Sequence, residues 1–200
     1  MHISKEYITD SADQLLRSSR LANQAYTEIT SAVEAMVGRI NNSSKNGNGV
    51  VPIKEGCYQL LEEEYQWYRE KPLKVLSSKG GPIDVYKEFH NGLHLFRVGL
   101  EFETGNISSA HRSMNKLSLG IQVGELDLAV ILLPIHELSY YLTDRVSNYE
   151  ELEPYFSLVE DIPFIVIGFD AEEYTTAVDS LPKGKDGMSD RAIHRWKNAH

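Results

Sequence analysis

The sequence predicts an α/β sandwich, in which helices cover the faces of a β-sheet. Two runs are almost wholly apolar, residues 126–135 (LDLAVILLPI) and 163–169 (PFIVIGF), and such runs are typical of strands buried on both faces. Elsewhere apolar residues recur at helical spacing, so helices alternate with strands. The chain has 200 residues, of which 42% are hydrophobic and 24% charged. These values predict a single globular domain over residues 1–200.

The first half of the chain is expected to contain two helices followed by two strands. Asparagine, serine and glycine make 41–49 (NNSSKNGNG) a loop. A break at GGP is followed by two segments that alternate apolar and polar residues, as strands with one wet face do. In chain order we expect a helix capped by Asp10 or Ser11 and running to about Val37, a helix from about Pro52 to Tyr68, and strands at 83–89 and 94–104.

The second half is expected to alternate helices with the two buried strands. Asn106 or Ser108 can cap a helix that runs to about Val123. The remaining elements are strands at 126–135 and 163–169 and short helices at 137–142, 150–158 and 189–198. The sequence contains neither an internal repeat nor a low-complexity domain.

The net charge of −9 is concentrated in one part of the chain. Residues 126–182 contain 12 acidic side chains against a single basic one, Arg145, whereas 183–200 carry a net charge of +3. An acidic run of this kind is most simply a solvated face that keeps the protein soluble. The total charge therefore does not exclude a polyanionic partner, because the remaining surface is close to neutral.

Several classes of protein are disfavoured by what the sequence lacks. The single cysteine, Cys57, excludes a disulfide framework and suits a reducing compartment, so we expect a cytoplasmic protein. The longest apolar run, 128–135, is too short to span a membrane. The seven histidines show no spacing typical of a zinc site, and neither a phosphate-binding P-loop nor a serine nucleophile elbow is present. Cys57 is expected to be a packed core residue.

Three carboxylates are candidates for chemistry. Glu101 and Glu103 are two apart on an expected strand, so both project from one face, and a hairpin would bring Asp84 beside them. Carboxylates this close repel each other, and a hard cation such as Mg²⁺ removes that repulsion. Such an ion assists the hydrolysis of phosphodiesters. The alternative is that both glutamates simply form the wet face of a half-buried strand.

Long stretches of the sequence resemble the BamHI-like family of type II restriction endonucleases. The matching runs appear in the same order along nearly the whole chain. They are VVPIKEGCY, WYREKPL, GGPIDVYKEF, LEFETGNISSAHRSMNKLSLG, LDLAVILLPIHELSYYLTDRVSNYEELEPYF, PFIVIGF and PKGKDGMS. The resemblance implies a central mixed β-sheet sandwiched by helices, with a restriction-endonuclease-like, PD-(D/E)xK core. It also implies Mg²⁺-dependent cleavage of a palindrome, GGATCC, after its first G to leave 5′ GATC overhangs.

The resemblance also assigns catalytic roles. It implies that Asp84, Glu101, Glu70 and the carbonyl of Phe102 hold the metal. In the wider superfamily a lysine stands where this chain has Glu103. Glu103 is then the candidate base, because an ionised carboxylate accepts a proton and a charged lysine does not.

Recognition of the DNA bases maps onto a second set of residues. Arginine suits guanine, asparagine suits adenine and aspartate accepts from cytosine. By resemblance the DNA-binding set is Lys54, Asn106, Ser108, Arg112, Asp144, Arg145, Gly187 and Met188. The alternatives are a helix cap for Asn106 or Ser108, a surface ion pair between Asp144 and Arg145, and a solvated tail around Gly187.

The palindrome implies a homodimer with one active site for each strand, and a cognate DNA methyltransferase as a functional partner. Two further hypotheses stay open: a protein of the same fold that reads DNA without cutting it, and an acidic interaction domain without a role in DNA binding.

Overall fold

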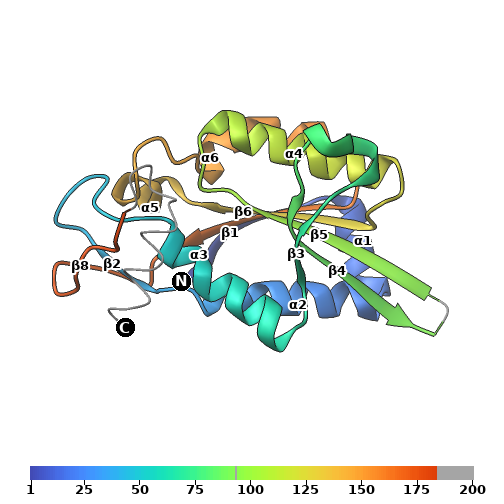
Figure 1. Cartoon of the computed structure of the whole chain (residues 1–200), viewed down its shortest axis with the longest axis horizontal. Helices are drawn as coiled ribbons and strands as arrows, with labels where there is room; N and C mark the ends of the chain where they lie inside the picture. Colours follow the sequence, from blue (N-terminus) through green and yellow to red (C-terminus); the bar gives the residue numbers. More distant parts are fainter. Residues whose placement is uncertain (93, 184–200) are drawn as a thin grey trace.

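A mixed six-stranded sheet forms the centre of the computed structural model, which describes residues 1–92 and 94–183 (Figure 1). From one edge to the other its strands are β1 (His2–Ile8), β7 (Phe164–Asp170), β6 (Leu128–Pro134), β5 (His94–Phe102), β4 (Ile83–Asn91) and β3 (Tyr68–Lys71). Strands β7, β6 and β5 are parallel to one another, and the remaining pairs are antiparallel. The predicted α/β sandwich with a central mixed sheet is confirmed.

Helices cover both faces of this sheet. On one face lie α1 (Asp10–Ser18), α2 (Arg20–Glu34) and α3 (Val51–Gln59), and on the other lie α4 (Ile107–Gln122), α6 (Tyr149–Leu152) and the 3₁₀ helix η3 (Glu153–Val159) (Figure 1). Each face has its own apolar core, because alternate residues of β6 and β7 point to opposite sides. All seven residues of β6 are buried, as the apolar run predicted.

The expected long N-terminal helix is two helices. Ser19 has an extended backbone (φ −113°, ψ 117°), and its side chain accepts a hydrogen bond from the amide of Ala22. Serine therefore ends α1 and caps α2 at the same position. The cap of α1 is Thr9, whose side chain accepts from Ala12, and neither Asp10 nor Ser11 has that role. A periodic apolar face alone did not reveal this break, since both helices present the same kind of face to the core.

The second helix is also shorter than predicted. After α3 the chain makes one π-helical turn, η1 (Leu60–Glu64), and leaves it through Gln66 at a positive φ of 58°. The following residues form the edge strand β3, which brings Glu70 alongside β4. Strand β1 was not predicted at all, because it lies at the other edge of the sheet, where most of its side chains are partly or fully exposed.

The remaining elements are small. They are the parallel pair β2 (Arg39–Asn41) and β8 (Glu173–Thr175), the helix α5 (His136–Tyr141) and the 3₁₀ helix η2 (Lys74–Lys79). Cys57 is buried in the core, as expected, and burial raises the pKa of its thiol to about 12. Among the described residues there is no helix with the length and apolar character needed to cross a membrane. The short helix expected at 189–198 lies outside the described residues.

Candidate active site

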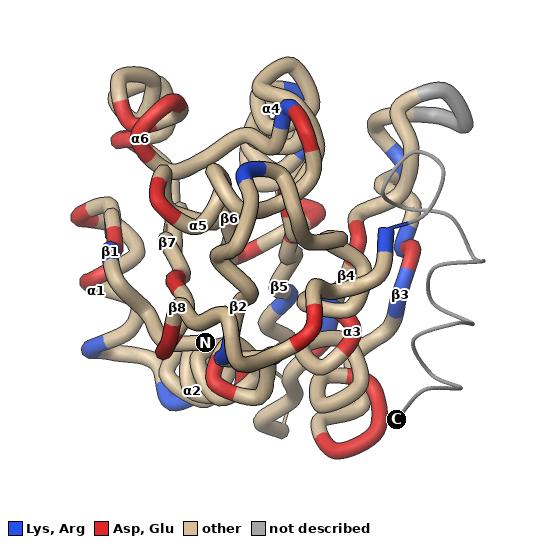
Figure 2. The backbone as a smooth tube through the Cα atoms, turned by 90° about the vertical axis from the view of Figure 1, so that its left-hand side faces the viewer, with Lys and Arg blue, Asp and Glu red and all other residues tan. Residues whose placement is uncertain are grey.

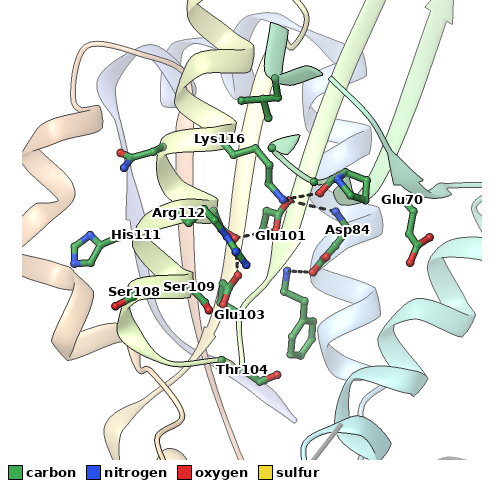
Figure 3. Close-up of a pocket in the computed structure, with 18 of the residues that line it drawn as sticks. Glu70, Asp84, Glu101, Glu103, Thr104, Ser108, Ser109, His111, Arg112 and Lys116 are labelled. Carbon is green, nitrogen blue, oxygen red and sulfur yellow. Dashed lines mark hydrogen bonds and ion pairs between the residues drawn. The ribbon is translucent and has the colours of Figure 1, made fainter. Parts of the chain in front are cut away.

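A cleft of about 940 Å³ opens where β4, β5 and α4 meet (Figure 3). The ends of β4 and β5 form its base, and one side of α4 borders it, while Glu70 of β3 lies on the opposite side (Figure 3). Lys54 of α3 also lines the cleft. Eight of the residues singled out in the sequence line this cleft: Lys54, Glu70, Asp84, Glu101, Phe102, Glu103, Ser108 and Arg112. Residues separated by nearly 60 positions in the chain thus share one cavity.

The hairpin of β4 and β5 sets Asp84 beside Glu101. Val85 pairs with Leu100 in this hairpin, so the next residue of each strand toward the cleft is Asp84 and Glu101. The amide of Asp84 donates to Glu101 Oε1 over 3.3 Å. Asp84 Oδ2 in turn accepts from the amide of Phe102 and from the hydroxyl of Tyr58, both at 3.1 Å. These contacts orient the aspartate toward the end of β5.

Glu101 and Glu103 meet at one hydroxyl. Ser113 Oγ of α4 lies 2.9 Å from Glu101 Oε2 and 2.5 Å from Glu103 Oε1. The two glutamates are buried, with 2% and 7% of their surface exposed. A serine hydroxyl carries a single proton, so it cannot donate fully to two carboxylates at once. Ser113 alone therefore does not offset the negative charges of Glu101 and Glu103, which require a nearby cation or added protons.

The ammonium of Lys116 supplies part of that positive charge. Its Nζ lies 2.5 Å from Glu101 Oε1 and donates to the carbonyl of Pro82 over 2.6 Å (Figure 3). The sequence interpretation passed over both Ser113 and Lys116. The helical spacing could have indicated them, because these polar residues recur on the same side of the helix as the apolar Ala110 and Leu117, which is the buried side of α4.

Burial raises the pKa values of the two glutamates. For Glu101 the loss of hydration is the largest cause and the neighbouring Asp84 the next, while Lys116 and Ser113 act in the opposite direction. For Glu103 the loss of hydration again dominates, and the hydrogen bond from Ser113 opposes it. Both carboxyls thus favour a partner that carries positive charge.

The donor atoms at this site suit a small, hard divalent cation. Asp84 and Glu101 offer carboxylate oxygens, and the carbonyl of Phe102 lies on the same side of β5 as the amide that contacts Asp84. Glu70 lies on the far side of Asp84 from Glu101 (Figure 3). Among residues 1–92 and 94–183, no group of three or more His, Cys, Asp or Glu side chains is already gathered around one ion position. The cation beside Glu101 in this arrangement is Lys116.

The expected base-reading residues lie near the start of α4. Asn106 caps this helix by accepting from the amide of Ser109 over 3.1 Å, so the expected alternative role of Asn106 as a cap holds. Asp144 and Arg145 form an exposed pair, with 3.7 Å between Oδ2 and Nε. The turn that carries Asp144 and Arg145 is held next to the start of α4, because the backbone amide of Ser147 donates to the carbonyl of Gly105 over 2.7 Å.

Lys54 faces the cleft from α3, where burial lowers its pKa. The pKa is held up against that effect by the negative charges of Asp84 and Glu103. Gly187 and Met188 lie outside the described residues. The acidic helix α6 lies on the side of α4 that is away from β3 and β4 (Figure 2). The two acidic residues of α6 thus lie away from β3 and β4.

Comparisons with known proteins identify the family of the chain. Residues 1–188 match the model of the family described as restriction endonuclease BamHI. The chain is 59% identical to the type II restriction enzyme BamHI of Bacillus amyloliquefaciens, over 99% of this chain and 98% of that protein. It is 37% identical to the type II restriction enzyme OkrAI of Oceanobacter kriegii, over 75% of this chain and 78% of that protein.

Among solved structures, the chain resembles restriction endonuclease BglII complexed with a DNA 16-mer. The TM-score is 0.64 with 17% sequence identity, and the match covers 86% of this chain and 81% of that one. At this identity the match supports the fold alone. The family match over nearly the whole chain goes further: the protein belongs to the BamHI family of restriction endonucleases and is a type II site-specific nuclease.

Proposed function

We propose that this nuclease recognises the palindrome GGATCC and cuts after the first G, leaving 5′ GATC overhangs. The observation that carries the proposal is that one cleft holds candidate residues for both cutting and reading DNA. It is lined by the acidic cluster, defined as Asp84, Glu101 and Glu103, and by three of the candidate DNA-binding residues, Lys54, Ser108 and Arg112. The likeness to the type II restriction enzyme BamHI supports this choice of sequence. The whole chain, 1–200, is taken as one nuclease domain.

Metal binding is assigned to Asp84, Glu101, Glu70 and the carbonyl of Phe102, with Mg²⁺ as the cofactor. When bound, Mg²⁺ would supply positive charge that stabilises the phosphate as its bond to the leaving oxygen breaks. Asp84 is oriented for this role by Tyr58 and by the amide of Phe102.

Glu103 is the proposed base. Its carboxylate is held by Ser113 and faces the same cleft as Asp84. Burial raises its pKa, which makes the ionised form a better proton acceptor than an exposed glutamate would be. In this role Glu103 orients the attacking water and takes its proton.

Base recognition is assigned to the start of α4 and its neighbours. The N-terminus of a helix presents free N–H groups and a partial positive charge, which favour an approach to phosphates. Arg112 is assigned to guanine, Asn106 to adenine and Asp144 to cytosine. Ser108 and Arg145 complete the base-reading set, and Lys54 has a helping role. Gly187 and Met188 are assigned to an approach to the minor groove.

A two-fold symmetric site is read most simply by a two-fold symmetric homodimer with one active site for each strand. A protein that cuts GGATCC would also cut the DNA of its own cell. We therefore include a DNA methyltransferase that modifies this sequence as a functional partner, and the cytoplasm as the location.

The test is incubation of a plasmid carrying one GGATCC with the protein in Mg²⁺, in Ca²⁺ and without metal. We expect a single linear product with Mg²⁺ alone, with GATC overhangs on sequencing of its ends. A plasmid changed at one base of the site serves as the control. Cutting of both plasmids would contradict the proposed specificity, and specific binding in Ca²⁺ without cutting in Mg²⁺ would favour a DNA-binding protein without nuclease activity.

Glu103→Lys tests the proposed base within the same assay. A charged lysine cannot accept a proton, so we expect cleavage to fall at least about 100-fold while specific binding in Ca²⁺ is kept. Turnover close to that of the unmodified protein would rule out this role for Glu103.

A further inference from the structure

Lys116 is a cation built into the wall of the acidic cleft. Its side chain is 9% exposed, and it contacts Glu101 Oε1 at 2.5 Å and the carbonyl of Pro82 at 2.6 Å. Lysines are almost never buried to this extent unless they are paired, because removing an ammonium from water is costly. The position of Lys116 is thus specified by the acidic cluster that it contacts.

The helix that carries Lys116 also faces the other parts of the cleft. Helix α4 begins at the Asn106 cap, places Ser108 and Arg112 at the cleft, and one turn after Arg112 places Lys116 on Glu101. Ser113 lies between them on the same helix and contacts both glutamates. One rigid element therefore links the candidate DNA-reading residues to the charge of the acidic cluster.

The acidic cluster, defined as Asp84, Glu101 and Glu103, would repel a DNA phosphate in the absence of a divalent cation. The ammonium at Glu101 reduces that repulsion, and the geometry keeps it there through Pro82. We propose that Lys116 is the resident counter-cation of the acidic cluster, which allows a DNA phosphate to approach the cluster before a divalent cation binds. This inference rests on the proposed function, in which DNA occupies the cleft.

A measurable coupling follows from this role. If Lys116 already supplies positive charge, adding a divalent cation strengthens DNA binding only modestly. Without Lys116, metal-free DNA binding weakens, and the divalent cation has to restore the missing charge. Metal and DNA then increase each other's affinity by a larger factor, and the two increases are equal by thermodynamic linkage.

The experiment measures the affinity of the full chain for a GGATCC duplex in EDTA and in Ca²⁺, at alkaline pH. Lys116→Met keeps the length and the apolar stem of the side chain, and Lys116→Arg keeps the charge. Lys5→Met is the control, because Lys5 pairs with Glu150 on β1 and α6, outside the cleft. We expect Lys116→Met to bind the duplex about tenfold more weakly in EDTA and to recover in Ca²⁺. Lys116→Arg and Lys5→Met are expected to behave like the unmodified protein.

Equal affinities of the unmodified protein and Lys116→Met in EDTA would overturn the inference. So would an equal loss in EDTA and in Ca²⁺, which would mark Lys116 as a purely structural residue. Circular dichroism checks each variant for folding, and Lys116→Gln replaces Lys116→Met if methionine at this position prevents folding. The proposed function is judged separately, by plasmid cleavage with the unmodified protein in Mg²⁺.

Discussion

At the scale of single residues, the candidate metal ligands depend on neighbours that hold them in place. Tyr58 is the clearest case, because its hydroxyl donates to Asp84 Oδ2 over 3.1 Å while the guanidinium of Arg69 lies 4.1 Å from the centre of its ring. Burial raises the pKa of the Tyr58 phenol well above its usual value, so the hydroxyl remains a donor. Tyr58 is therefore a positioning residue for Asp84.

Tyr58→Phe removes this hydrogen bond and keeps the ring. We expect Ca²⁺ to bind the protein–DNA complex about tenfold more weakly, because residues that orient metal ligands typically contribute this much to metal affinity. Calorimetry with Ca²⁺ measures the change. Tyr86→Phe is the matched control, since its hydroxyl donates to Glu88 away from the cleft. If the two variants bound Ca²⁺ equally well, Tyr58 would have no positioning role.

At the scale of secondary-structure elements, α4 combines folding and function in one residue. Asn106 both caps the helix and is the candidate reader of adenine, and the cap uses only its side-chain oxygen. Within residues 1–92 and 94–183 the amide nitrogen of Asn106 has no hydrogen-bond partner, so it can contact a base and the two roles are separable by substitution.

Asn106→Ser preserves the cap and removes the amide. Because serine caps helices about as well as asparagine, we expect the free energy of unfolding to change by less than about 0.5 kcal/mol. Binding to GGATCC is expected to weaken by about 1–3 kcal/mol, the usual contribution of one good base contact. Urea unfolding and a DNA titration measure the two quantities. A large loss of stability with unchanged binding would reverse this assignment.

Helix α2 and strand β4 are joined by a buried ion pair on the face opposite α4. Lys87 Nζ lies 2.7 Å from Glu28 Oε2, which also accepts from Trp67 Nε1 over 2.8 Å, and Lys87 donates to the carbonyl of Tyr65. Glu28 is only 6% exposed. Its charge depends on these partners because almost no water reaches it.

Lys87→Met leaves that buried carboxylate without its cation. We expect the free energy of unfolding to fall by about 3–5 kcal/mol, as measured by urea denaturation. Arg39→Met is the control, because its pair with Glu173 is half-exposed and should contribute no more than about 1 kcal/mol. Similar decreases in the free energy of unfolding for the two variants would show that the buried ion pair stabilises the protein no more than the half-exposed one.

At the scale of the whole molecule, the distribution of charge matters more than its total. The acidic helix α6 lies on the side of α4 that is away from β3 and β4 (Figure 2). Arg112 and Lys116 lie beside the acidic cluster in the cleft (Figure 3), which Lys54 also lines. The net charge of −9 therefore describes the molecule's average and not the surface proposed to meet DNA.

Metal affinity is expected to depend on pH. The pKa values of Glu101 and Glu103 are raised, chiefly by burial, so a fraction of each stays protonated above the usual carboxyl range. A divalent cation needs the ionised forms and must displace those protons, so affinity should rise from about pH 6 and level off by about pH 9. Calorimetry with Ca²⁺ on the protein–DNA complex tests this. A constant affinity over that range would contradict it.

Much of the fold was predictable because local patterns specify it. The apolar runs of β6 and β7 are buried on both faces, and α4 begins and ends within a residue or two of its expected limits. The break at Ser19 and the edge strand β1 were not predicted. Their signals are weak, since a serine in a periodic helix and a mostly polar edge strand both acquire their structure from neighbouring elements.

By itself, the sequence determined the α/β class, the strands that carry Asp84 and Glu101, and the family to which the chain belongs; Glu103, expected on the same strand, follows the end of β5 at Phe102. These follow from side-chain periodicity and from long runs that match the family, and both are local properties of the linear sequence. Only the tertiary structure decided that Ser113, Lys116 and Tyr58 meet those carboxylates. The physical reason is burial, because a carboxylate removed from water takes its partners from whichever elements pack against it.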